Sequence, residues 1–383
     1  MKKRLVLAGS AVVASLGLGV AAVPAVAQPL TLNVRCGDVA GLITAVTQAN
    51  ANPDGGTISL AHRCVYRFTT GIGFNALPPI TSRVTIKGHD SSLIRSTSIA
   101  PTFRLLNVAP TGDLTLRGVV VNGGRLLTQS GGGIFNEGTL LLEDSTVSGN
   151  QAVNGGGIYN HNGRVTVVDS KILNNIAILT QGGGLFNTSN GNATLKKTTV
   201  AGNTANTDGG GIENAGTLRV LEHSVFTHNE AHEHDGGAID NEGYATINDS
   251  RFIANWAALE GGAINTDLRS TLEVRETVFE LNKAGRDGGA INNESLTTLE
   301  KSKVEKNSSG RDGGGINNET ASARTRVPGA RLTLIHSLVA ENRAAEDGGG
   351  INNQQNSLVE LRESKVIHNL PTNCAGNVAH CVG

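Results

Sequence analysis

Aromatic residues, methionine and net charge are all scarce in this sequence of 383 residues. Eight phenylalanines, three tyrosines and one tryptophan make up 3% of the chain, and there is one methionine. A core packed around large rings is therefore excluded, and the core must be built from aliphatic side chains. The formal net charge is -1, so the chain lacks the basic surface on which binding to nucleic acid or to an anionic membrane depends. Nucleic acid is not expected among its partners.

A long apolar run occurs once, at the beginning of the chain. Basic residues at 2–4 precede the apolar run 5–20, and small residues follow at 25–27. This order of segments is typical of a cleaved signal peptide. A membrane anchor is the alternative, but it needs about 20 continuous apolar residues, and Pro24 interrupts the run. We predict that 1–27 is a signal peptide, that no transmembrane segment remains after cleavage, and that the protein is secreted, extracellular or at the cell surface.

Only four cysteines occur, and all lie near the ends of the chain. Cys36 and Cys64 lie near the start, and Cys374 and Cys381 lie near the end. An even number of cysteines in an oxidising compartment favours disulfides, and proximity favours pairing within each end because closing a short loop costs less entropy. We predict the disulfides Cys36–Cys64 and Cys374–Cys381. A zinc site is the alternative, and it would require the two ends to meet in space.

Glycine, by contrast, is abundant, with 50 residues, and much of it belongs to an internal repeat. A Gly-Gly-(Gly or Ala)-(Ile or Leu) segment occurs nine times, and each copy is followed by a second signature, (Ser or Thr)-x-apolar-x-x-Asn. Successive copies lie 24 to 27 residues apart, except for a last interval of 35. The aliphatic positions are Ile134, Ile158, Leu185, Ile212, Ile239, Ile264, Ile291, Ile316 and Ile351. Two signatures that alternate along the chain nine times at nearly constant spacing indicate a repeat architecture.

Within each repeat, apolar residues alternate with polar or variable residues, as at Leu140 and Leu142 or at Val165 and Val167. A period of two over four to six residues predicts short strands. Helical repeats are the alternative, but each glycine would cost about 1 kcal/mol in a helix interior. We therefore predict an all-β fold, a right-handed parallel β-helix of about ten coils in which each coil stacks on the previous one.

The ends of such a solenoid need caps, because they expose apolar surface and unpaired strand edges. After Asp38, apolar residues follow helical spacing up to Val46, which predicts a capping helix. The predicted organisation is a signal peptide at 1–27, an N-terminal cap with a short helix and a disulfide at 28–82, β-helix repeats at 83–370 and a C-terminal disulfide cap at 371–383.

Two sets of asparagines have predicted roles in the coil. In Gly-Gly-x-Ile-x-Asn, the Ile and the Asn point to the same side of the strand, inward, so the asparagines should form an internal amide ladder. Its members are Asn136, Asn160, Asn187, Asn214, Asn241, Asn293, Asn318 and Asn353, with Thr266 as the interruption.

The asparagine that ends the second signature, such as Asn150, is predicted to take the left-handed conformation at one corner of the coil. The glycine pair is predicted to permit positive φ at another corner.

The residue between the inward Ile and the inward Asn should point outward, one per coil. The first five of this column are Phe135, Tyr159, Phe186, Glu213 and Asp240, and asparagines follow. We predict these five as a ligand-binding face, because stacked rings offer sugars an apolar platform and carboxylates about 5 Å apart suit calcium or retaining glycoside hydrolysis. The alternative is that the rings pack under a loop and the acids are solvated.

An acid precedes six of the Gly-Gly pairs, namely Asp208, Asp235, Glu260, Asp287, Asp312 and Asp347. In stacked coils these carboxylates lie about 5 Å apart and repel one another unless they are solvated or bridged. Asp208 and Asp235 are the candidate calcium ligands, and no other cofactor is predicted. The alternative is Asp-Gly turn chemistry, with Arg286 and Arg311 supplying partial neutralisation.

Three histidines offer another candidate metal site. His228, His232 and His234 lie beside Asp235 and could bind a transition metal. They fall at variable turn positions, which favours the alternative of solvated loop histidines.

Three repeats carry a fuller motif. Gly-Gly-Ala-Ile at 236–239, 261–264 and 288–291 is accompanied by Phe-x-x-Asn at 226–229, 252–255 and 279–282. With these motifs the sequence resembles the GGAI and FxxN repeats of polymorphic outer membrane proteins, and it is similar to secreted bacterial right-handed parallel β-helix repeat proteins. The former are adhesins, so the resemblance implies a surface or extracellular binding protein without catalysis, with glycans or cell-surface components as partners.

A polysaccharide-active enzyme is the alternative function, because pectate lyases and polygalacturonases have the same fold. Polygalacturonase-like chemistry would need a close Asp-Asp pair and a Gly-His-Gly segment, and neither occurs. No catalytic residue is predicted. A lyase or glycoside hydrolase that uses the outer face of the β-helix stays open as the alternative.

Overall fold

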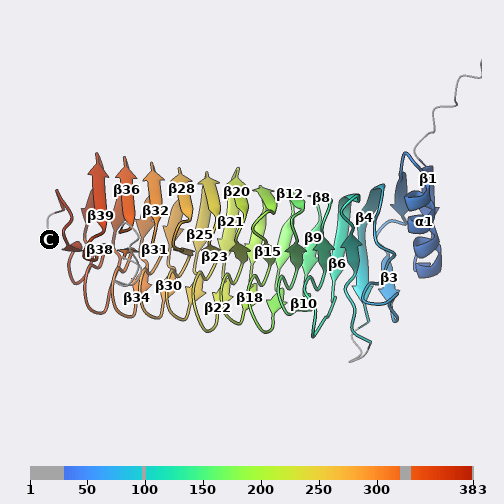
Figure 1. The fold of residues 1–383 in the computed structure, drawn as a ribbon, viewed down its shortest axis with the longest axis horizontal. Coiled ribbons are helices and arrows are strands. Elements are labelled where there is room, and N and C mark those ends of the chain that lie inside the picture. The colour runs from blue at the N-terminus through green and yellow to red at the C-terminus, as the bar shows by residue number, and fades with distance from the viewer. Residues whose placement is uncertain (1–29, 97–100, 320–328, 382–383) are drawn as a thin grey trace, which may run out of the picture.

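The protein is an elongated solenoid of stacked coils (Figure 1). The computed structural model describes residues 30–96, 101–319 and 329–381, and the predicted signal peptide 1–27 lies outside them. The strands form three sheets that run along the solenoid, with about 12 turns. The predicted right-handed parallel β-helix is confirmed, with somewhat more coils than expected.

The first sheet has 23 strands and receives two strands from most coils. It begins with β1 (Leu30–Val34), β2 (Gly56–Leu60), β3 (Val65–Phe68), β4 (Arg83–Arg95) and β6 (Asp113–Asn122). The earlier strand of each later coil is β8 (Thr139–Glu143), β12 (Arg164–Val168), β16 (Asn192–Lys196), β20 (Thr217–Leu221), β24 (Tyr244–Asn248), β28 (Thr271–Arg275), β32 (Leu296–Glu300), β36 (Arg331–Ile335) and β39 (Leu358–Arg362). The later strand is β9 (Thr146–Ser148), β13 (Lys171–Leu173), β17 (Thr199–Ala201), β21 (Ser224–Thr227), β25 (Ser250–Ile253), β29 (Val278–Glu280), β33 (Lys303–Glu305), β37 (Leu338–Ala340) and β40 (Lys365–Ile367).

The other two sheets receive one short strand per coil. The 11-stranded sheet, here called the second sheet, contains the Ile-x-Asn segments. Its strands are β5 (Leu106–Val108), β7 (Ile134–Asn136), β11 (Ile158–Asn160), β15 (Leu185–Asn187), β19 (Ile212–Asn214), β23 (Ile239–Asn241), β27 (Ile264–Thr266), β31 (Ile291–Asn293), β35 (Ile316–Asn318), β38 (Ile351–Asn353) and β41 (Cys374–Gly376). The third sheet consists of β10 (Gln151–Ala152), β14 (Ile176–Ala177), β18 (Thr204–Ala205), β22 (Glu230–Ala231), β26 (Trp256–Ala257), β30 (Lys283–Ala284) and β34 (Ser308–Ser309).

Each coil lies in register on the next, so equivalent residues of the repeat stack in columns. Ile134, for example, pairs with Ile158 in the next coil, and both are fully buried. Most of the core is aliphatic, as expected. Three phenylalanines of the FxxN motifs are its largest stacked group, with ring centroids 4.6 Å apart for Phe226 and Phe252 and 5.0 Å apart for Phe252 and Phe279.

The predicted internal amide ladder is present. Each Nδ2 donates to the Oδ1 of the equivalent asparagine in the next coil at 2.7 to 2.8 Å, from Asn136 to Asn241 and again from Asn293 to Asn353. Thr266 interrupts the ladder as predicted, and its buried hydroxyl has no hydrogen-bond partner among the residues described. The ladder satisfies polar groups inside the solenoid and holds neighbouring coils in register.

The corner prediction is half right. The first glycine of each Gly-Gly pair is left-handed as predicted, with φ +61° at Gly209. The asparagine that ends the second signature is not left-handed; the residue before it is, as at His228 with φ 52°. The asparagine is buried instead, and Asn203 Nδ2 donates to Asn229 Oδ1 at 3.0 Å in a second ladder. The residue in this left-handed position varies from coil to coil, and in one coil it is Leu281. The stacking of the coils, and not the residue type, therefore imposes this corner.

The predicted cap features are present at both ends. The N-terminal helix α1 (Val39–Ala51) begins at Asp38, whose side chain accepts a hydrogen bond from Gly41 N–H at 2.7 Å, and it buries Leu42 and Val46. Both predicted disulfides form, with no free cysteine. No helix in the described ranges is both long and apolar enough to cross a membrane. The domain boundaries remain predictions.

Candidate functional site

The outward column of the second sheet begins with three stacked rings. Phe135 in β7, Tyr159 in β11 and Phe186 in β15 pair in register. The ring centroids are 5.5 Å apart for Phe135 and Tyr159 and 5.1 Å apart for Tyr159 and Phe186, with interplanar angles of 11° and 27°. The three side chains, here called the aromatic stack, are half-buried. Their ring faces contact one another, so the ring edges form the outer surface in place of the open faces expected.

Arg104 and His161 border the aromatic stack. The guanidinium carbon of Arg104 lies 4.7 Å from the centroid of the Phe135 ring, and burial lowers the pKa of Arg104 to about 10. The His161 ring lies 6.1 Å from the Phe135 ring and 6.0 Å from the Tyr159 ring, centroid to centroid. A cation therefore closes one end of the stack.

The column continues into two buried carboxylates. Glu213 in β19 pairs with Phe186, and Asp240 in β23 pairs with Glu213. The exposed fractions of Glu213 and Asp240 are 0% and 3%. The prediction that this column forms an open outer face is therefore wrong at these two residues. The alternative, that the two acids are solvated, is wrong as well. The Gly-Gly turn before the strand is the cause, because a Cβ on Gly209 would lie 2.5 Å from Ile212 O and 2.8 Å from Glu213 N. The turn folds directly onto the strand and shields the side chain that follows.

Glu242, directly after β23, completes a group of three carboxylates. One oxygen each of Glu213, Asp240 and Glu242 lie within 4.8 Å of one another. Neither carboxylate oxygen of Glu213 has a hydrogen-bond partner in the described part of the chain. Burial, followed by the charge of Asp240, raises the pKa of Glu213 well above its usual range. Burial, followed by the charges of Asp267 and Asp208, does the same to the pKa of Asp240.

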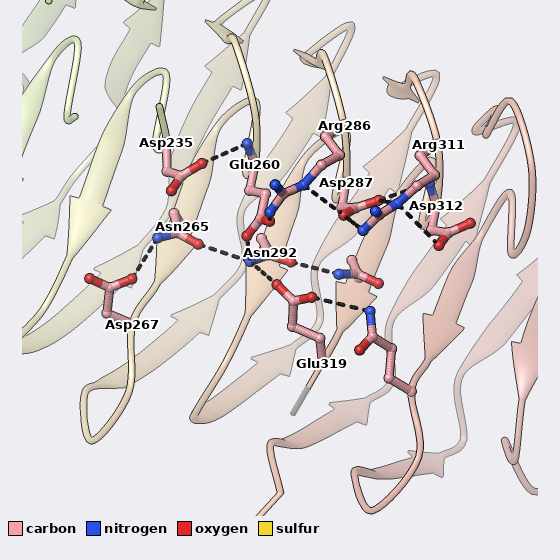
Figure 2. A network of polar contacts seen from close by, with 12 residues as sticks. Asp235, Glu260, Asn265, Asp267, Arg286, Asp287, Asn292, Arg311, Asp312 and Glu319 are labelled. Atoms are coloured by element: carbon pink, nitrogen blue, oxygen red, sulfur yellow. Dashed lines mark hydrogen bonds and ion pairs between the residues drawn. The ribbon is translucent and has the colours of Figure 1, made fainter. Parts of the chain in front are cut away.

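Four asparagines continue the column as a third amide ladder. Asn265 Nδ2 donates to Asp240 Oδ1 at 2.8 Å. Figure 2 shows the next step, in which Asn292 Nδ2 donates to Asn265 Oδ1 at 3.0 Å. Asn317 and Asn352 extend the ladder with bonds of 2.8 and 2.9 Å. The position of these residues in the column was expected from the sequence, but the ladder was not, although the same residue type at one position of four successive repeats was the available signal.

The acids before the Gly-Gly pairs are bonded to the backbone of the next coil. Glu260 N–H donates to Asp235 Oδ1 at 2.8 Å, and Asp235 N–H donates to Asp208 Oδ1 at 3.2 Å. Asp312 N–H donates to Asp287 Oδ1 at 3.0 Å in the same way. This geometry favours turn chemistry over calcium for the column as a whole. The structure does not bring Asp208 and Asp235 into either group of three carboxylates that could hold a metal within the described residues.

The second such group is Glu260, Asp287 and Glu319, and arginines already neutralise it. Arg286 forms ion pairs with Glu260 and, at 3.3 Å, with Asp287. Arg311 also pairs with Asp287, and its Nε lies 2.9 Å from Oδ1 (Figure 2). The neutralisation expected from Arg286 and Arg311 is therefore confirmed, and it is confined to this later part of the solenoid.

A second column of acids follows the strands of the second sheet. Its members are Glu242, Asp267, Glu294 and Glu319. They occupy equivalent positions, since Glu294 N–H donates to Thr266 O at 2.9 Å and Glu319 N–H donates to Asn293 O at 3.0 Å. This column was not predicted, although the sequence places an acid directly after the inward Asn or Thr in four successive repeats.

The three histidines do not gather into a metal site. His232 Nε2 lies 3.1 Å from Glu230 Oε2, and His234 Nδ1 lies 3.5 Å from Asp208 Oδ1. The rings of His232 and His234 are about half exposed, and His228 contacts the hydroxyl of its neighbour Thr227. This arrangement favours loop histidines over a transition-metal site.

The second acid column predicts a pH-dependent stability. Burial raises the pKa of Glu294 to about 7, helped by the charges of Glu319, Asp267 and Asp235 and opposed by Arg286. In the unfolded chain, the pKa of Glu294 is near 4.5. Between about pH 4.5 and 7, the unfolded chain has released this proton and the folded chain still holds it. The free energy of unfolding therefore falls as the pH rises through this range. We expect Glu294→Gln to raise the free energy of unfolding at about pH 8 by about 1 to 3 kcal/mol and to leave it nearly unchanged at about pH 4.

Urea unfolding followed by circular dichroism in buffer with EDTA measures this difference. Glu363→Gln is the control, because the Glu363 side chain is 79% exposed, and it should change stability little at either pH. An equal gain for Glu294→Gln at both pH values would contradict the assignment.

Two family models match the chain. Residues 158–332 match the right handed beta helix region, and residues 144–161 match the Chlamydia polymorphic membrane protein repeat. Neither the comparison with curated proteins nor that with solved structures gave a significant match. The fold is thus a right-handed β-helix built of repeats, and the segment 144–161 is similar to the polymorphic membrane protein repeat, as the resemblance implied. This similarity and the two disulfides indicate an extracellular or surface protein.

Proposed function

We propose that this chain is a secreted, non-catalytic binding protein that attaches to glycans or other cell-surface components through the aromatic stack of the second sheet. The position of the three rings carries the proposal. Phe135, Tyr159 and Phe186 stack in register on the outside of a solenoid whose core has room for rings, as the buried phenylalanines show. Partly exposed rings concentrated on one face are typical of a contact surface.

The stack suits oxygen-rich ligands. The edge of an aromatic ring carries partial positive charge, and here the ring faces are occupied by one another. Sugar hydroxyl or carboxylate oxygens can therefore approach the edges, while the Tyr159 hydroxyl donates or accepts a hydrogen bond. Parallel pairing holds the three rings rigidly, so binding would cost little side-chain entropy.

The buried carboxylates support binding over glycoside hydrolysis. A retaining hydrolase needs an ionised carboxylate that reaches the sugar. Glu213 is 0% exposed, and burial raises the pKa of both Glu213 and Asp240 well above the usual range, which favours their protonated forms. The pair therefore lacks the access to a sugar that a nucleophile needs, and in the absence of a bound cation it lacks the charge as well.

Retention of the purified chain on glycan arrays and on cells tests the proposal. We expect Tyr159→Ala to weaken retention at least about tenfold, because truncating a central aromatic contact removes most of its binding energy. Tyr244→Ala is the matched control, since Tyr244 is a tyrosine of β24 in the first sheet that is 37% exposed.

Two results would contradict the proposal. One is retention of Tyr159→Ala equal to that of the wild-type chain on every glycan and cell surface that holds it. The other is release of reducing sugars or unsaturated products from acidic or neutral glycans, which would favour the alternative function, a polysaccharide-active enzyme.

A further inference from the structure

We infer that Glu213, Asp240 and Glu242 bind one calcium ion on the second sheet, directly beside the aromatic stack. The inference goes beyond the proposed function, since it concerns an ion site and needs no glycan. It rests on two independent observations. The three carboxylate oxygens lie within 4.8 Å of one another, and the fully buried Glu213 carboxylate has neither of its oxygens hydrogen-bonded within the described residues.

A buried carboxylate without partners is costly, because it loses its hydration and gains nothing in return. The charges that act most strongly on Glu213 are the negative charges of Asp240, Glu242, Asp208 and Asp267. A divalent cation would supply both the missing charge and the missing contacts for the Glu213 oxygens.

The second group of three carboxylates provides an internal comparison. There, Arg286 pairs with Glu260 and Arg311 pairs with Asp287, and Asn292 Nδ2 donates to Glu260 at 2.7 Å and to Glu319 at 2.9 Å. The same fold therefore places three acids together twice. Arginines pair with one group, and among the residues that the structure describes no Lys, Arg or His forms an ion pair with Glu213, Asp240 or Glu242.

The donor set fits calcium better than other common metals. All three groups are carboxylates, which hard cations prefer, whereas zinc prefers histidine and cysteine. Two oxygens that share one calcium ion at about 2.4 Å lie at most about 4.8 Å apart, and the three oxygens here meet that limit. Magnesium demands near-ideal octahedral geometry and gives up its waters reluctantly, so a group made only of protein carboxylates suits it less well.

The ion would enter from the side of Glu242. Glu242 is exposed, whereas Glu213 and Asp240 are covered by the glycine turns. Asp240 Oδ1 also accepts the hydrogen bond of Asn265, so the third amide ladder holds this carboxylate in place on one side. Phe186 adjoins Glu213 on the other side.

Calorimetric titration of calcium chloride into the EDTA-stripped and desalted chain tests the inference. We expect one calcium ion per chain, and a melting temperature that rises by about 5 °C or more in about 5 mM calcium. Glu213→Gln and Glu242→Gln should each weaken calcium binding at least about tenfold, since each removes one charged ligand. Because Glu242 is exposed, its variant should keep the fold, which circular dichroism verifies.

Glu363→Gln is the control, because Glu363 is an exposed acid between β39 and β40 of the first sheet. This variant should bind calcium as the wild-type chain does. The inference is overturned by a wild-type chain that shows neither heat nor a melting shift with calcium, which would mean that the acids share protons instead. Calcium binding that both ligand variants leave unchanged, or an equal response to magnesium, would overturn it as well.

Discussion

Asn203→Ala is expected to lower the free energy of unfolding by about 3 to 5 kcal/mol. The Asn203 side chain makes four buried hydrogen bonds in the second ladder. Its Nδ2 donates to Ile172 O at 2.9 Å and to Asn229 Oδ1 at 3.0 Å, and its Oδ1 accepts from Asn175 N and Nδ2, each at 3.0 Å. Alanine leaves the Ile172 carbonyl and the Asn175 N–H buried without these partners, and each such group costs about 1 to 3 kcal/mol.

Urea unfolding followed by circular dichroism measures the loss. Asn248→Ala is the matched control, because Asn248 is an exposed asparagine at the end of β24, and we expect a change below about 0.5 kcal/mol. A loss of less than about 1 kcal/mol at Asn203 would show that water or a shifted neighbour replaces the ladder, contrary to this account.

Gly210→Ala is expected to destabilise the chain by about 3 kcal/mol or more, because the backbone leaves no space for a side chain. A Cβ at Gly210 would lie 2.4 Å from Gly237 O and 2.5 Å from Glu230 O. Both contacts are backbone atoms of the next coil, so no side chain can turn away to relieve them. We expect the variant to melt far below the wild-type chain or to fail to fold, as measured by circular dichroism.

Gly211→Ala is the matched control for this prediction. It lies at the next position of the motif, where other repeats carry Ala238, Ala263 and Ala290, all fully buried. A Cβ at Gly211 would lie 2.5 Å from one backbone oxygen, Ala238 O, but the alanines of the other repeats show that the fold accommodates a methyl group at this position, so we expect a much smaller loss. Equal losses for Gly210→Ala and Gly211→Ala would mean that any added volume in the turn is harmful, and the second backbone segment that Gly210 meets, at Glu230, would not be the cause.

The aromatic stack and the carboxylate group place two different chemistries next to each other on one sheet. Phe186 pairs with Glu213, so the proposed contact surface and the inferred calcium site are adjacent along the solenoid. The tests separate them, since Tyr159→Ala removes a ring and leaves the carboxylates, and Glu242→Gln removes a charge and leaves the rings.

The sequence by itself determined the solenoid and its columns. A repeat of 24 to 27 residues that keeps phase brings each residue onto its equivalent in the next coil, because parallel strands stack in register. For that reason the internal ladder from Asn136, its interruption at Thr266 and the alignment of Phe135 with Asp240 could all be predicted. The disulfides could be predicted too, since their partners are close in the chain.

Only the tertiary structure decided what covers each column. Alternation along a strand tells which side Glu213 faces, but not whether a neighbouring turn shields that side. The shielding comes from glycine turns such as Gly209, which have no side chain and so fold directly onto the strand. Likewise, Arg286 and Arg311 reach acids that belong to other repeats. Burial and charge at the site depend on contacts between coils, which the periodicity of a single strand does not encode.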